Sequence, residues 1–287
     1  MAALPPGISS HKFRLDHMIF FDIDGTLIDH LSASATASLT LYDHFCGQIP
    51  FTREEFPATW ESIMDRHFNR FCRGEISLWD QRRERIRESF GAPQLSDADA
   101  DARYYFFIRE YEQLTRAYDD AGPCLEKLLP TSPKTGEKWG AQKRLGIISN
   151  GAREQQLGKL RRAGLLRYFS VTVFSEDTGR GKPDPSIFHE ACKRAGEDPS
   201  QCVHVGDDLT NDIHAGHAVG LRPIWIDRLG RGATGVPARS IASLAELTEV
   251  LEERDCTGAQ KQEALPQEAL PQRTQSRTEE VSQRFFP

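Results

Sequence analysis

The sequence predicts an α/β protein in which a Rossmann-like, doubly wound parallel sheet carries an inserted all-helical cap domain. Five apolar runs of four or five residues, bounded by turn residues, are typical of buried strands. Segments of helical length alternate with the last four runs, as in parallel sheets. Between the first run and the others, residues 31–118 show only helical periodicity. The five expected strands are Met18–Phe21, Leu145–Ser149, Val171–Phe174, Cys202–Gly206 and Pro223–Ile226.

Glycine and proline mark the ends of the helices that we expect between these strands. Gly164, Gly196 and Gly220 each follow a helical stretch, and glycine is the residue that most often ends a helix. Gly122 and Pro123 open a short helix through Leu129, after which the polar stretch 130–140 is expected to be a surface loop. The remaining expected helices span residues 152–163, 185–195, 209–219 and 244–251.

The insertion predicts four or five helices and no strand. Ser32 or Ser34 is the expected cap of its first helix, which carries apolar residues on one side. The alternating charges of Gln81–Glu88 predict a solvated helix face. The aromatic block Tyr104–Phe107 is expected to be core between the cap helices.

Composition limits the classes of function. The net charge of −6 gives no reason to expect a nucleic-acid partner. No run approaches the roughly 18 apolar residues that span a bilayer. The six cysteines form no C-x-x-C pair, so we expect reduced thiols and a cytoplasmic protein. We expect this protein to be a monomer or a homodimer.

Shifts in composition predict the domain boundaries. Residues 1–15 look like a flexible leader without the apolar segment of a secretory signal. Residues 254–287 are rich in Gln, Glu, Pro and Arg and are expected to be disordered. The domain that carries the sheet is expected in 16–30 and 119–253, with the helical cap in 31–118.

The first strand ends in two carboxylates. Asp22 and Asp24 are two positions apart, so they should emerge near each other at the end of the strand, where open α/β sheets build their sites. Close carboxylates repel, and a shared proton or a cation normally relieves the repulsion. Gly25 allows a sharp turn after them. A plain strand-to-loop turn is the alternative, because Asp and Gly are common in turns.

Two later segments add groups suited to phosphate. Ser149 and Asn150 end the second strand and offer a hydroxyl and an amide to phosphate oxygens, although they would also suit an ordinary turn. Lys182, in a Gly-x-Gly-Lys-Pro-Asp stretch, is either a compact positive charge at the site or a solvated lysine before a helix.

The fourth strand ends in an acidic cluster. Asp207, Asp208 and Asp212 fall within six residues, and three carboxylates at a strand end suit a hard cation such as Mg²⁺. Asp207 or Asp208 would serve equally as the cap of the next helix.

In this order, the segments 21–26, Ser149-Asn150, Lys182-Pro183 and 206–212 resemble the four motifs of the haloacid dehalogenase (HAD) superfamily. The resemblance covers residues 17–252, and the insertion matches the position of a type-one helical cap. The Ile-Ser-Asn-Gly and Gly-x-Gly-Lys-Pro-Asp stretches are similar to nucleotidase-like and phosphoglycolate phosphatase-like members.

The resemblance implies a role for each of these residues. Asp22 would be the nucleophile that forms an aspartyl-phosphate, and Asp24 the general acid and then the base. Mg²⁺ would bind Asp22, the backbone carbonyl of Asp24, and Asp207. Phosphate oxygens would bind Ser149, Asn150 and Lys182. Either Asp208 or Asp212 would complete or support the metal site.

The expected function is thus hydrolysis of a small phosphomonoester, either a nucleotide or a sugar or organic-acid phosphate. A mutase of the same superfamily and a non-enzymatic binding module are the alternatives. The cap would select the substrate, and the stretch 30–40 and the turn around Gly74 are expected to face it.

Overall fold

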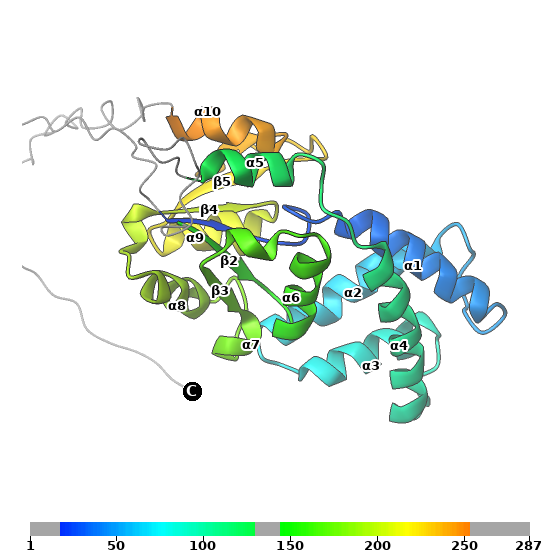
Figure 1. Ribbon diagram of the computed structural model, residues 1–287. Coiled ribbons are helices and arrows are strands. Elements are labelled where there is room, and N and C mark those ends of the chain that lie inside the picture. The colour runs from blue at the N-terminus through cyan, green and yellow to red at the C-terminus, as the bar shows by residue number, and fades with distance from the viewer. Residues whose placement is uncertain (1–17, 130–143, 253–287) are drawn as a thin grey trace, which may run out of the picture. The chain divides into compact units, whose positions relative to one another are not determined.

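The computed structural model describes residues 18–129 and 144–252, which form a six-stranded parallel sheet and its helices (Figure 1). The strand order is β3-β2-β1-β4-β5-β6. The expected leader, the loop 130–140 and the tail 254–287 lie outside the described residues. The strands are β1 Met18–Phe21, β2 Leu145–Ser149, β3 Val171–Phe174, β4 Cys202–Gly206, β5 Arg222–Ile226 and β6 Arg239–Ile241.

The position of β1 confirms the predicted fold class. It lies between β2 and β4, with Phe21 opposite Ile147 on one side and Val205 on the other. After β1, strands β2 and β3 are added on one side of it, and β4 is then added on its other side. The carboxyl ends of β1, β2 and β4 therefore meet where the strand order reverses, which is where such sheets bind ligands. The sequence did not reveal β6, which has only three residues, two of them exposed.

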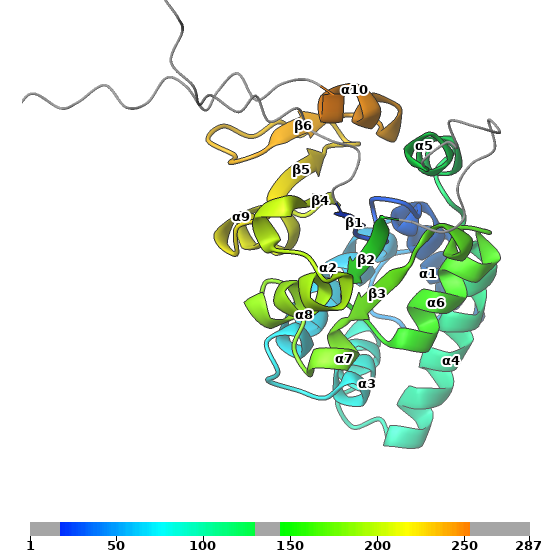
Figure 2. The same ribbon diagram turned by 60° about the vertical axis from the view of Figure 1, so that its left-hand side comes forward.

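Helices cover both faces of the sheet because neighbouring strand residues point in opposite directions. Phe21 packs in a cluster with residues of α5, α6 and α10, whereas Phe20 packs with residues of α8 and α9 (Figure 2). The core helices are α5 Ala121–Leu128, α6 Arg153–Arg162, α7 Ser175–Thr178, α8 Pro185–Ala195, α9 Ala215–Ala218 and α10 Leu247–Glu252. Short 3₁₀ turns occupy Leu166–Tyr168, Pro199–Gln201 and Leu244–Glu246, and the π-helical turn η3 spans Leu209–His214.

The segment between β1 and α5 contains four helices and no named strand, as expected for the cap. Their apolar sides form a separate core around Trp60 and Phe107. The exact domain boundaries stay predictions. These helices are α1 His30–His44, α2 Phe56–Cys72, α3 Leu78–Ser89 and α4 Asp97–Leu114.

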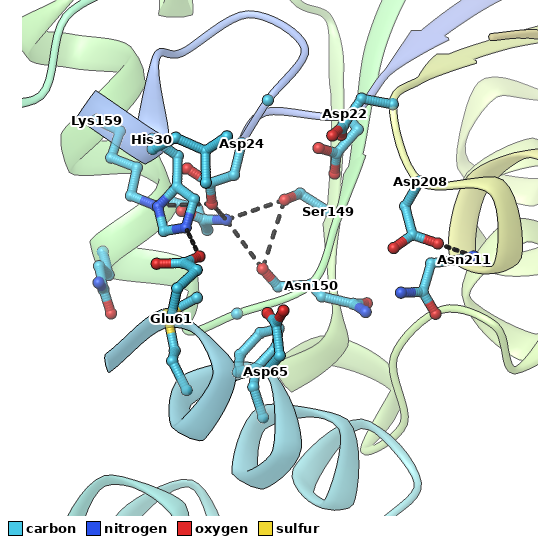
Figure 3. A pocket seen from close by; sticks show the side chains of 18 of the residues that line it. Asp22, Asp24, His30, Glu61, Asp65, Ser149, Asn150, Lys159, Asp208 and Asn211 are labelled. Atoms are coloured by element: carbon cyan, nitrogen blue, oxygen red, sulfur yellow. Dashed lines mark hydrogen bonds and ion pairs between the residues drawn. The ribbon is translucent and has the colours of Figure 1, made fainter. Parts of the chain in front are cut away.

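The expected cap of the first insertion helix was wrong. Asp29 caps α1, because its carboxylate accepts a hydrogen bond from the Ser32 N–H at 3.1 Å. Ser34 is buried inside the helix, and its hydroxyl donates to Glu61 at 2.9 Å. The helix thus starts only six residues after Asp24, and the side chain of His30 lies beside Asp24 (Figure 3).

The stretch 81–88 is not simply a solvated face. Gln81 and Arg85 are only 3% and 5% exposed, because a stripe at four-residue spacing on α3 faces the other cap helices. Charge alternation alone does not show which side of a helix is covered. The expected aromatic core is confirmed for Tyr104 and Phe107, whereas Tyr105 is 54% exposed. Within the described ranges, no helix is long and apolar enough to cross a membrane.

Candidate active site

A cavity of about 400 Å³ lies at the carboxyl ends of β1, β2 and β4, lined by residues of the sheet side and of the cap helices (Figure 3). The strands bring together side chains that are more than a hundred residues apart in the sequence. All of the site residues expected from the sequence line this cavity: Asp22, Asp24, Ser149, Asn150, Lys182, Asp207, Asp208 and Asp212.

Lys182 holds the carboxylate that ends β1. Its Nζ lies 2.5 Å from Asp22 Oδ1, 2.6 Å from Asp212 Oδ1 and 3.1 Å from the carbonyl oxygen of Ile148. Burial lowers the pKa of Lys182, but Asp212 and Asp22 outweigh it and raise the pKa above its ordinary value. Lys182 is therefore a buried, charged amine, and not a solvated lysine before a helix.

Three carboxylates form a group that suits a divalent cation. One oxygen from each of Asp22, Asp207 and Asp212 lies within 4.8 Å of the other two. Burial and the neighbouring carboxylates raise the pKa of Asp22 to about 7 against the opposing effect of Lys182, and they raise that of Asp207 to about 8. This repulsion is the kind that a bound cation relieves. A hard, oxygen-only donor set of this charge fits Mg²⁺.

The structure separates the two acidic residues that the sequence left undecided. Asp212 belongs to the carboxylate group. Burial would raise the pKa of Asp212, but Lys182 and His204 outweigh burial and lower the pKa. Asp208 instead caps η3, where its Oδ1 accepts hydrogen bonds from the N–H groups of Thr210 at 2.8 Å and Asn211 at 2.7 Å.

Two glycines make room for these carboxylates. Gly25 has a φ of +82°, and a Cβ there would lie 2.4 Å from Asp207 Oδ2. A Cβ on Gly206 would lie 2.2 Å from Asp212 Cγ. Only glycine permits both approaches, so the turn residues noted in the sequence are also part of the site.

Asp24 has a different set of partners. Lys159 Nζ lies 2.7 Å from both of its carboxylate oxygens, and Gln156 Nε2 donates to it at 3.0 Å. Burial would raise the pKa of Asp24, but Lys159 and His30 outweigh it and lower the pKa to about 2. The two members of the predicted carboxylate pair therefore contact different lysines, Lys182 and Lys159.

Ser149 and Asn150 lie at the end of β2, as expected. Ser149 Oγ accepts from Gln156 Nε2 at 2.9 Å. The side chain of Asn150 clamps the Lys182 backbone, with Oδ1 accepting from the Lys182 N–H at 2.7 Å and Nδ2 donating to the Lys182 carbonyl at 2.8 Å. A Cβ on Gly181 would lie 2.4 Å from Asn150 Oδ1, which accounts for the glycine before the lysine.

Comparison with known proteins identifies the family. Residues 17–220 match the haloacid dehalogenase-like hydrolases. The chain belongs to this family. The match covers the whole of β1 to η3 and includes every residue of the carboxylate group.

Relatives of the HAD chain include a phosphatase and a nucleotidase. N-acylneuraminate-9-phosphatase of Mus musculus is 27% identical over 250 residues, covering 83% of this chain and 94% of that protein. Pyrimidine 5'-nucleotidase YjjG of Escherichia coli is 38% identical over 111 residues, covering 38% of this chain and 49% of that protein. The structure of the HAD-hydrolase YfnB of Bacillus subtilis, which is bound to magnesium, has a TM-score of 0.65 and 25% identity and covers 83% of this chain and 99% of YfnB.

Sequence reasoning missed a polar network between the HAD core and the cap. His30 Nε2 lies 3.0 Å from Glu61 Oε1 (Figure 3). His30 Nδ1 lies 2.9 Å from the hydroxyl of Tyr111. Lys159 lies over the ring of Tyr111 at 5.2 Å. The only local signal was the place of His30, six residues after Asp24 and directly before the insertion.

The cap segments expected to face the substrate were largely wrong. His30 and Leu31 line the cavity, but residues 32–40 and Gly74 do not. The wall comes instead from α2, α3 and α4, because the inner sides of these helices, and not their connecting turns, face the strand ends. These wall residues are Glu61, Met64, Asp65, Phe68, Asn69, Leu78, Gln81, Arg82, Arg85, Tyr104, Phe107, Ile108 and Tyr111.

Proposed function

We propose that this HAD hydrolase is a Mg²⁺-dependent phosphatase that cleaves a small phosphomonoester through an aspartyl-phosphate on Asp22. The observation that carries the proposal is the convergence of Asp22, Asp207 and Asp212 around Lys182 at the end of β1. Such a site places carboxylates around the buried amine of Lys182, in a cavity that a small ligand can enter. It meets the needs of phosphoryl transfer, which depends mainly on positioning and charge.

In the first half-reaction, Asp22 attacks phosphorus while the bond from phosphorus to the ester oxygen breaks. The departing alkoxide takes a proton from Asp24 in its protonated form. Water then attacks phosphorus, Asp24 accepts the proton from that water, and the acyl-phosphate bond to Asp22 breaks to release inorganic phosphate. The ionised Asp24 held by Lys159 and Gln156 is in the state that the second half-reaction needs, and it must take up a proton from solvent before the first.

Mg²⁺ would be held by Asp22, Asp207 and the Asp24 carbonyl, with Asp212 beside it, and would offset the charge that otherwise keeps one anion from attacking another. Lys182 supplies a further fixed positive charge next to Asp22. Ser149 offers its hydroxyl to a phosphate oxygen. Asn150 acts chiefly by holding the Lys182 backbone, because its amide is already bonded there.

The substrate class is a nucleotide or a sugar or organic-acid phosphate. Two relatives, a phosphatase of N-acylneuraminate 9-phosphate and a pyrimidine 5'-nucleotidase, favour these two groups. A cavity of about 400 Å³ accommodates a molecule of this size.

Release of inorganic phosphate from an aryl phosphate tests the proposal. We expect Mg²⁺-dependent turnover by the wild type and none by Asp22→Asn. A protein that binds phosphate esters without hydrolysing any of them would be a binding module. Conversion of a sugar phosphate to its isomer without phosphate release would indicate a mutase.

A further inference from the structure

Arg85 is a buried cation that no carboxylate of the described residues contacts directly. It lies on α3, lines the cavity and is only 5% exposed. Within residues 18–129 and 144–252 it makes no hydrogen bond or ion pair, and its Nε is buried without a partner. Among the described residues, its guanidinium lies over three aromatic rings: its Cζ is 4.9 Å from the ring centroid of Trp60, 5.4 Å from that of Tyr104 and 5.6 Å from that of Phe107.

The other buried cations at the cavity are already paired. Lys182 binds Asp22 and Asp212, and Lys159 binds Asp24. Glu61, which is a nearby cap carboxylate, uses both of its oxygens, one on His30 and one on Ser34. Arg82 also lines the cavity, and it donates to the neutral Gln155 at 3.2 Å. Glu61 and Asp65 also line the cap side of the cavity, but no described carboxylate forms a hydrogen bond or ion pair with Arg85, and Glu61 acts on it only from a longer distance.

Burying a guanidinium without a counter-ion is costly unless a ligand provides one. The aromatic rings stabilise the flat side of Arg85 and leave its N–H edge available, and that edge matches a carboxylate in a two-point hydrogen bond. We propose that Arg85 binds a carboxylate on the part of the substrate remote from the phosphate. The substrate is then the phosphate ester of a hydroxylated carboxylic acid.

Gln81 supports the hydroxylated part of this class. It lies one helical turn before Arg85, lines the same cavity and is only 3% exposed, and its Oε1 has no hydrogen-bond partner among the described residues. An acceptor of this kind suits a hydroxyl group next to the carboxylate. A second phosphate would bring about two negative charges to one guanidinium, whereas a carboxylate matches it one to one.

This inference rests on the proposed phosphatase function, and paired substrates test it separately. 6-Phosphogluconate and glucitol 6-phosphate differ only in the group at the end remote from the phosphate, which is a carboxylate in one and a hydroxymethyl in the other. Wild-type kcat/KM should be roughly 10- to 100-fold higher for 6-phosphogluconate, as expected for a hydrogen-bonded charge pair. Glycerol 3-phosphate and 3-phosphoglycerate repeat the comparison with a shorter span.

Arg85→Met keeps the length and the apolar contacts of the side chain and removes the charge. We expect it to reduce the preference for the carboxylate to within about threefold, with little change in kcat/KM for an aryl phosphate. Arg83→Gln is the matched control, because Arg83 lies on the same helix but pairs with Asp97 and Asp101 and does not line the cavity. It should keep the wild-type preference.

Equal wild-type kcat/KM values within both substrate pairs would overturn the inference even if Arg85→Met did not fold. A proportional loss on all substrates in Arg85→Met would also overturn it, since that is the result of a purely structural role. Calorimetry of 6-phosphogluconate and glucitol 6-phosphate binding to Asp22→Asn tests the carboxylate site separately from the proposed phosphatase function. A binding preference without wild-type turnover would reject the phosphatase and retain the carboxylate site.

Discussion

Asp22 and Asp24 differ in surroundings although only one residue separates them. Asp22 shares Lys182 with Asp212 and lies among carboxylates, so its pKa is raised to about 7, chiefly by burial. Asp24 pairs with Lys159, and its pKa is lowered to about 2 although burial opposes this. Two carboxyl groups whose environments separate their pKa values are the arrangement on which a division of roles depends.

Substituting each carboxylate separately tests that division. Asp22→Asn should form no phosphoenzyme, because the nucleophile is gone. Asp24→Asn should turn over an aryl phosphate about 10²–10⁴-fold more slowly, since no base activates the water, yet it should accumulate phosphate on Asp22. Intact-protein mass spectrometry after rapid acid quench measures the added phosphoryl group. Retained turnover in Asp22→Asn would instead indicate direct attack by water.

A methyl group added at Gly206 should lower kcat. In Gly206→Ala the new Cβ would lie 2.2 Å from Asp212 Cγ, so Asp212 or the strand end must move. A displacement of about 1 Å at such a site can cost about 10²-fold in rate, and we expect a loss of that order in kcat. Gly122→Ala is the control, because nothing lies within 4 Å of its added Cβ. Equal activity of both variants would show that the site tolerates the shift.

At the level of elements, His30 joins three cap helices near the core. It begins α1, bonds Glu61 of α2 and lies 2.9 Å from the hydroxyl of Tyr111 of α4. Burial by itself lowers the pKa of His30, but Tyr111, Glu61 and Asp24 outweigh burial and raise the pKa to about 10. The protonated imidazole therefore helps to hold the cap helices together.

This arrangement predicts how stability depends on pH. Because the pKa of folded His30 is above its ordinary value of 6.5, its contribution is complete below about pH 6.5 and is lost as pH rises through about 10. At about pH 6, His30→Gln should lower the free energy of unfolding by roughly 1–3 kcal/mol, as for a hydrogen bond to a charged group. The difference from wild type should shrink by about pH 10.

Urea unfolding of both proteins across this pH range provides the measurement. Glu61→Gln should also lose this pH dependence, because it removes the carboxylate that His30 contacts. A stability difference that stays constant from about pH 6 to pH 10 would contradict the assignment.

For the molecule as a whole, a few polar contacts join the cap and the core around the cavity. Asn150 Nδ2 donates to Cys72 Sγ at 3.2 Å, the Gly181 N–H donates to the Cys72 carbonyl at 3.3 Å, and Arg82 reaches Gln155. The core side provides the carboxylate group Asp22, Asp207 and Asp212 and Lys182, whereas the cap provides Arg85, Glu61, Asp65 and the aromatic wall. Under the two proposals above, the core would carry out the chemistry and the cap would select the substrate.

Metal removal acts on the whole protein. EDTA should abolish activity and lower Tm, because the carboxylate group then repels itself and the phosphate, and Mg²⁺ should restore both. Asp207→Asn should raise the Mg²⁺ concentration needed for half of full activity. Asp208→Asn should not, because Asp208 caps η3 and asparagine also caps helices. If Asp208→Asn but not Asp207→Asn raised this Mg²⁺ concentration, the metal ligand would be Asp208 and our assignment of Asp207 would be wrong.

The sequence by itself determined the strands, the order of the chemical groups and the carboxyl edge at which they gather. Periodicity and turn residues are local signals, and the side chains that follow parallel strands must emerge at one edge of the sheet. Five of the six strands and the neighbouring site residues could therefore be predicted. The short edge strand β6 could not, because two of its three residues are exposed and show no apolar run.

Only the tertiary structure decided which charges meet. Lys159 is 135 residues from Asp24, and Lys182 is 160 residues from Asp22, so no local pattern links them. The charged stretch on α3 looked solvated in sequence, yet packing against α2 and α4 turns Arg85 inward. The reason is physical: a charged side chain has the same local pattern whether it faces water or a cavity, and the difference depends on what the fold places opposite it.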